Sequence, residues 1–173
     1  MLFRSHLPTQ DMKKVILDCD TGVDDAQAIM LALGSSDVDL IAITCVFGNM
    51  DVEQAAQNTA RVLQAAGRMD IPVFVGCHKP LIKIPLVYTD FSDATNYHGI
   101  DGLGDAPEAT VEEPPYSKII RDKAASVALC DLINQYPHEI TLVATAPLTN
   151  VAMAFRLDRS VAGKLKDMYI MGE

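Results

Sequence analysis

The chain has 173 residues, of which 49% are apolar and 21% are charged, so it is compatible with one domain that encloses a sizeable core. Its formal net charge of −9 argues against nucleic acid or an anionic membrane as a general partner, because either would require a basic patch. A small-molecule partner fits this composition better.

Residues 1–13 are expected to form an N-terminal extension to a single domain that spans residues 14–173. The extension has no apolar core long enough for a secretory signal, and no later stretch approaches a membrane span. We therefore expect a cytoplasmic protein, with a mitochondrial presequence as the alternative. The four cysteines lack paired zinc spacing and are expected to be reduced thiols.

The first regular pattern is an apolar run that ends in a cluster of aspartates, Asp18, Asp20, Asp24 and Asp25. Residues 15–17 are typical of a buried strand, and helical spacing of apolar residues then predicts a helix from near Asp24 to Gly34. Helix capping would explain one or two of the acids. It does not explain all four, and clustered carboxylates without His or Cys beside them favour a Ca²⁺ or Mg²⁺ site.

Strands and helices then alternate along the chain. Further strands are expected at residues 38–46, 71–75, from residue 140, and at 168–171. Helices are expected from Asp51 to Gly67, from Asp122 to Pro137, and after Pro147, where Thr149 would act as a cap. Residues 76–117 show no regular pattern. This alternation predicts an open, mainly parallel sheet of five strands with right-handed crossovers.

Two polar residues follow predicted strands, Asn49 after the second and Thr145 after the fourth. Because parallel strands end at one edge of the sheet, both should open toward the aspartate cluster. An Asn in this position is also a common turn residue. His98 lies in the glycine-rich stretch 97–104, where it is either a solvent-exposed loop residue or part of a binding pocket.

Residues 18–26, DCDTGVDDA, together with Ala28, resemble the signature DxDxGxDDAxA of the inosine-uridine preferring nucleoside hydrolases at every fixed position. Residues 145–150 resemble the Thr-x-x-Leu-Thr-Asn segment of that family, and residues 97–104 loosely resemble its His-Gly loop. The resemblance implies a Rossmann-like sheet with helices on both faces. It also implies that residues 14–173 form only the N-terminal part of the fold, which would be incomplete at its C-terminus.

The resemblance further implies an enzyme that cleaves the N-glycosidic bond of purine or pyrimidine ribonucleosides with a calcium-activated water. The implied ligands of Ca²⁺ are Asp20, Asp25 and the carbonyl of Thr145. Asp20 would also be the general base, and Asp18 would support the site from behind. The implied substrate contacts come from Asp24, Asn49 and His98. In the family, the missing part supplies another Asp ligand and further contacts to the ribose and base.

Two alternatives remain open from the sequence. One is a phosphohydrolase of the haloacid dehalogenase type with Asp18 as nucleophile, which Gly22 disfavours because that family carries Thr or Val there. The other is a non-catalytic isoform or fragment that associates with a full-length partner. We expect either a homo-oligomer or association through the uncovered C-terminal edge, and little activity from this chain alone.

Overall fold

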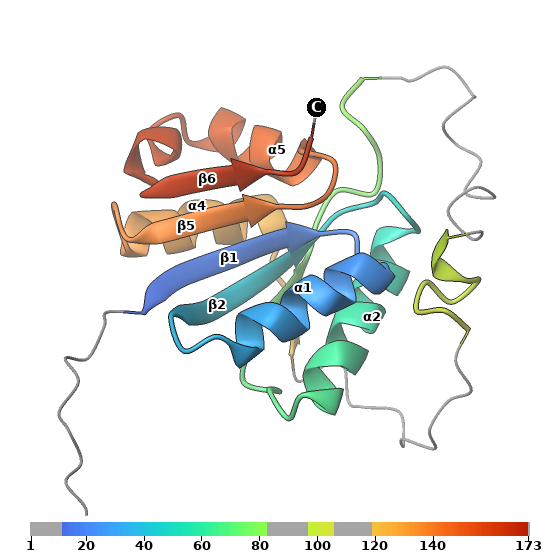
Figure 1. The fold of residues 1–173 in the computed structure, drawn as a ribbon. Coiled ribbons are helices and arrows are strands. Elements are labelled where there is room, and N and C mark those ends of the chain that lie inside the picture. The colour runs from blue at the N-terminus through green and yellow to red at the C-terminus, as the bar shows by residue number, and fades with distance from the viewer. Residues whose placement is uncertain (1–11, 83–96, 106–118, 173) are drawn as a thin grey trace, which may run out of the picture.

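The computed structural model describes residues 12–82, 97–105 and 119–172 (Figure 1). Most of the expected N-terminal extension lies outside these residues, and the first strand begins at its boundary, at Lys13. Among the helices in these ranges, none is both long enough and apolar enough to cross a membrane. All four cysteines are free thiols, as expected.

The described strands form one six-stranded sheet in the order β4-β3-β2-β1-β5-β6, and every neighbouring pair is parallel. The strands are β1 (Lys13–Cys19), β2 (Val38–Cys45), β3 (Val73–Val75), β4 (Ile120–Arg121), β5 (Ile140–Ala144) and β6 (Asp167–Ile170). The expected open parallel sheet is confirmed. The expected count of five strands is wrong, because β4 has only two residues and is too short to produce a periodic pattern.

Helices cover both faces of the sheet (Figure 1). They are α1 (Val23–Gly34), α2 (Val52–Ala65), α4 (Ala125–Gln135) and α5 (Thr149–Leu157), with a short 3₁₀ helix, η3 (Val161–Lys164), before β6. Leu17 of β1 packs in the core on the α1 and α2 side, whereas its neighbour Ile16 packs on the α4 and α5 side. Alternating side chains of a strand point to opposite faces, so a strand covered on both sides is apolar throughout.

Three expected boundaries are wrong by a few residues. The third strand begins at Val73 rather than at residue 71. Helix α4 begins at Ala125 rather than Asp122, because the chain first makes a turn in which the Lys123 amide donates to the Arg121 carbonyl. Thr149 is the first residue of α5 and Leu148 is its N-cap, so Thr149 does not cap the helix.

The order of the strands places the aspartate cluster at a change of direction in the sheet. From β1 the chain adds β2, β3 and β4 on one side, and β5 and β6 then add to the other side. In open parallel sheets, ligands bind beyond the carboxyl ends of the strands at such a switch point. The carboxyl ends of β1 and β5 are therefore where the fold favours a binding site.

Candidate active site

Asp18, near the end of β1, is fully buried and joins three elements. Its Oδ1 accepts hydrogen bonds from Thr44 Oγ1 of β2 at 2.5 Å and from Asn150 Nδ2 of α5 at 2.8 Å. Its Oδ2 has no hydrogen-bond partner in the part of the chain that the structure describes. Burial raises the pKa of Asp18 to about 6. Asp18 thus links β1 to β2 and α5 directly beneath the turn that carries the other aspartates.

Asp20, directly after β1, and Asp25, in the first turn of α1, form a buried pair of carboxyl groups. The backbone amide of Asn49 donates to Asp20 Oδ2 at 2.6 Å, and Thr145 Oγ1 donates to Asp25 Oδ1 at 2.7 Å. Burial and the neighbouring Asp25 charge raise the pKa of Asp20 to about 7, and burial also raises the pKa of Asp25. A cation between the two would favour their charged forms.

The residues expected at the carboxyl edge converge there. Thr145, directly after β5, donates its amide to the Asp18 carbonyl at 2.9 Å, which brings its side chain to Asp25. Asp20, Asn49 and Thr145 line one cavity of about 480 Å³. The other residues lining this cavity are Asp24, Ala146, Pro147, Leu148, Ile170, Met171 and Gly172. The expected convergence is confirmed, and the roles of these residues remain to be tested.

Two glycines allow this close packing. A Cβ atom on Gly22 would lie 2.7 Å from His98 Nδ1 and 2.9 Å from Asn49 Nδ2. A Cβ atom on Gly48 would collide with the Asp20 carboxylate. Glycine at these positions is therefore explained by the approach of neighbouring groups rather than by backbone conformation.

His98 does not line the cavity in the way the sequence suggested. Its side chain is only 17% exposed, and its Nδ1 accepts a hydrogen bond from the Val23 amide at 3.2 Å. The same Nδ1 lies 3.8 Å from Asp24 Oδ1, whose side chain is 59% exposed. His98 therefore lies behind Asp24, against the first turn of α1, and is not among the residues that surround the cavity.

Asn150 was not predicted as a site residue, although it lies in the segment 145–150 that resembles the family. Besides the bond to Asp18, Asn150 Nδ2 donates to the Cys45 carbonyl at 2.9 Å and its Oδ1 accepts from the Cys77 amide at 2.8 Å. A Cβ atom on Gly76 would collide with this carboxamide. An Asn in the first turn of a predicted helix was the available signal, but its burial and its partners depend on segments that lie far away in the sequence.

A match to one family model covers residues 15–172, and the model is described as the inosine-uridine preferring nucleoside hydrolase. The chain belongs to this family. The chain is 41% identical to the inosine-uridine preferring nucleoside hydrolase of Leishmania major and 38% identical to uridine nucleosidase 1 of Arabidopsis thaliana. Both alignments cover 92% of this chain, but 48% and 45% of the two relatives.

Solved structures of nucleoside hydrolases share the fold. A purine-preferring ribonucleoside hydrolase from Gardnerella vaginalis matches with a TM-score of 0.78 and 31% identity, over 92% of this chain and 48% of that chain. An inosine-guanosine nucleoside hydrolase matches with a TM-score of 0.79 and 33% identity, over 93% and 48%. The chain thus spans about half the length of the nucleoside hydrolases it matches.

The residues of this nucleoside hydrolase chain fit part of a calcium site. Asp20, Asp25 and Thr145 offer hard oxygen atoms, which are the ligands that Ca²⁺ prefers. Within residues 12–82, 97–105 and 119–172, however, no three His, Cys, Asp or Glu side chains form a group that could hold a metal ion. The pair Asp20 and Asp25 would need further ligands to complete the coordination of the ion.

The raised pKa of Asp18 predicts a pH dependence of stability. The folded chain holds this proton up to about pH 6, whereas an unfolded chain releases it near 3.8, so rising pH favours unfolding across this window. We expect the Asp18 contribution to lower the free energy of unfolding by about 2 kcal/mol between pH 4 and pH 7.5. Urea unfolding with chelator present would measure it.

The comparison is with Asp18→Asn, which removes this titrating group and should make the decline shallower, leaving the part that comes from the raised pKa values of Asp20 and Asp25. Asp37→Asn, at an exposed position, should leave the decline unchanged. An Asp18→Asn variant whose stability declines with pH as steeply as that of the natural chain would contradict the assignment.

Proposed function

We propose that this chain provides the metal-binding and ribose-binding part of a site that hydrolyses the N-glycosidic bond of ribonucleosides to ribose and free base. The observation that carries the proposal is the convergence of Asp20, Asn49 and Thr145 on one cavity, within a match to the nucleoside hydrolase family. Relatives are named for a preference for inosine, uridine, purine or pyrimidine nucleosides. Ribonucleosides are thus the proposed substrate class, with the base preference open.

Cleavage of this bond passes through a ribosyl group with oxocarbenium character, which needs negative charge nearby and a positioned water. The water oxygen bonds to C1′ of the ribose, the C1′–N bond breaks, and its electron pair leaves with the base, which takes up a proton from solvent. Asp20 would take the proton of the water as general base. Without a cation its pKa is about 7, and a bound cation would lower this pKa and keep the carboxylate in the form that accepts a proton.

The position of the Asp20 carboxyl supports this role. The Asn49 backbone amide donates to its Oδ2, which fixes the carboxyl group beside the cavity that it lines. Asp20, Asp25 and the carbonyl of Thr145 are the proposed ligands of Ca²⁺. When bound, the ion would bind the ribose diol and lower the pKa of a bound water.

Asp24 is the proposed partner of the ribose hydroxyls. It is exposed and lines the cavity at the start of α1, next to the buried Asp25. Asn49 lines the same cavity, and its backbone amide donates to Asp20. Its side chain is the proposed second contact to the substrate. Asp18 supports the turn from below through Thr44 and Asn150.

A titration with uridine followed by the amide resonances of the chain would test this proposal. We expect uridine, in the presence of calcium, to shift the resonances of Asp24, Asn49 and Thr145. The matched ligand 2′,3′-dideoxyuridine lacks the diol and should cause much smaller shifts. Equal shifts with both compounds, or none with uridine at millimolar concentration, would count against a ribose-binding site.

A further inference from the structure

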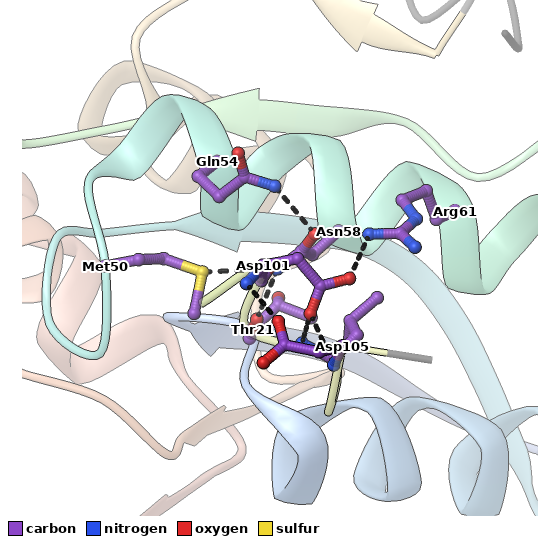
Figure 2. A network of polar contacts seen from close by, with 8 residues as sticks. Thr21, Met50, Gln54, Asn58, Arg61, Asp101 and Asp105 are labelled. Carbon is purple, nitrogen blue, oxygen red and sulfur yellow. Dashed lines mark hydrogen bonds and ion pairs between the residues drawn. The ribbon is translucent and has the colours of Figure 1, made fainter. Parts of the chain in front are cut away.

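Asn58, on α2, is a polar residue that is fully buried. Its neighbours on the same helical face, Ala55 and Val62, are apolar. A buried carboxamide lowers stability unless its donors and acceptor are hydrogen-bonded. Figure 2 shows that this side chain lies at the centre of a network of polar contacts from several segments. The proposed reaction gives no role to this network.

The Asn58 amide group joins the aspartate-bearing turn to the loop of residues 97–105. Its Nδ2 donates to the Thr21 carbonyl at 3.3 Å and to the Asp101 carbonyl at 2.9 Å, and it also contacts Met50 Sδ at 3.2 Å (Figure 2). Thr21 lies between Asp20 and Gly22 in the turn after β1. One side chain of α2 therefore holds both segments at once.

The other side of Asn58 is fixed by its own helix. Its Oδ1 accepts from Gln54 Nε2 at 3.0 Å and from Arg61 Nη1 at 3.4 Å. Arg61 Nη1 also lies 3.1 Å from Asp101 Oδ2, and both side chains are partly exposed. These contacts leave the carboxamide one orientation, with its amide group toward the turn and the loop.

The loop itself is compact. Asp101 Oδ1 accepts from the amides of Leu103 at 2.8 Å and Asp105 at 3.0 Å, and the Gly104 amide donates to the His98 carbonyl at 2.6 Å. Gly102 has φ of +81°, and a Cβ atom there would meet Met50 and lie 2.7 Å from Asn58 Nδ2. The loop therefore docks closely on Asn58, and docking also fixes where His98 lies.

At its other end the loop caps α1. Gly22, the N-cap residue, has no side chain, and the amide of the first helical residue, Val23, donates to His98 Nδ1 instead. An amide in the first turn of a helix has no partner within the helix. His98 thus supplies a cap from a distant part of the chain, beside Asp24.

We propose that Asn58 is a positioning residue: it docks the 97–105 loop on the turn after β1, so that His98 caps α1 and fixes the first turn that carries Asp24. The proposal rests on the proposed function only for the role of Asp24 in binding ribose. The placement of His98 can be tested without any substrate.

The experiment is amide hydrogen exchange by NMR on the 173-residue chain. In Asn58→Ala we expect the Val23 amide to exchange about tenfold faster, the size of effect that loss of one hydrogen bond allows. The Thr145 amide, which donates to the Asp18 carbonyl, reports general loss of stability and should change much less. His98→Ala should match Asn58→Ala, and the double variant should add nothing.

Gln57→Ala is the matched control, because it removes an exposed carboxamide from the same helix. If Val23 exchange rises no more than Thr145 exchange, or rises equally in Gln57→Ala, the proposal is wrong. Should Asn58→Ala fail to fold, Gly102→Ala undocks the loop from its own side and must give the same selective effect. If the Val23 amide is protected from exchange but the chain does not bind uridine, the proposed function is wrong. The placement of His98 by Asn58 would still hold in that case.

Discussion

Binding of Ca²⁺ to the chain is expected to disappear when Asp20 and Asp25 are both replaced by alanine. The two carboxyl groups are buried, and Asp25 contributes to the raised pKa of Asp20. Without a cation, their mutual repulsion and their burial disfavour ionisation, so a divalent ion recovers this energy on binding. Calorimetric titration of the metal-free chain with calcium would measure the heat of binding directly.

The matched control is the double variant Asp37→Ala, Asp122→Ala, which removes the same charge at two exposed positions. It should retain the calcium heat of the natural chain. Circular dichroism should show that the Asp20→Ala, Asp25→Ala variant remains folded, since the substitution removes two buried charges rather than a packing contact. Equal heats for this variant and the natural chain would place calcium elsewhere or nowhere.

The position of the acids could be predicted because it depends on topology alone. The apolar run before Asp18 and the helical spacing after Asp25 fixed a strand-to-helix turn, and alternation of strands and helices implied a parallel sheet. Parallel strands end at one edge, so Asn49 and Thr145 had to open toward the same place as Asp20. The register of β1 with β2 and β5 bears this out, since Asp18 pairs with both Thr44 and Ala144.

Contacts between buried side chains could not be predicted in this way. Asn150 bonds to Asp18 across 132 positions, and Asn58 meets the Asp101 carbonyl across 43. Neither spacing follows a helical or strand period, and each bond depends on how two packed elements approach. The orientation of the His98 ring is a similar case. The sequence of the glycine-rich loop does not predict that the ring contacts the Val23 amide, 75 positions away.

The structure also indicates how much of a nucleoside hydrolase site these residues can form. The cavity is lined by the segments after β1, β2 and β5, the start of α1, and the end of β6 with the two residues that follow it. Among the described strands β6 lies at an edge of the sheet, and Tyr169 and Ile170 of β6 and the following Met171 are exposed. We expect an apolar edge of this kind to associate with further polypeptide, whether a second copy or a longer family member.

We therefore expect the 173-residue chain alone to hydrolyse inosine and uridine at least about a hundredfold more slowly than a complete family member, even with excess calcium. The chain spans about half the length of the relatives it matches, so contacts to the ribose from the rest of a nucleoside hydrolase would be absent. Small misplacements of a reacting group are sufficient for a loss of this size. The assay should follow release of free base by the purified chain and record its mass and oligomeric state in the same sample. Turnover equal to that of a complete nucleoside hydrolase, from a monomer, would show that these residues are sufficient for catalysis.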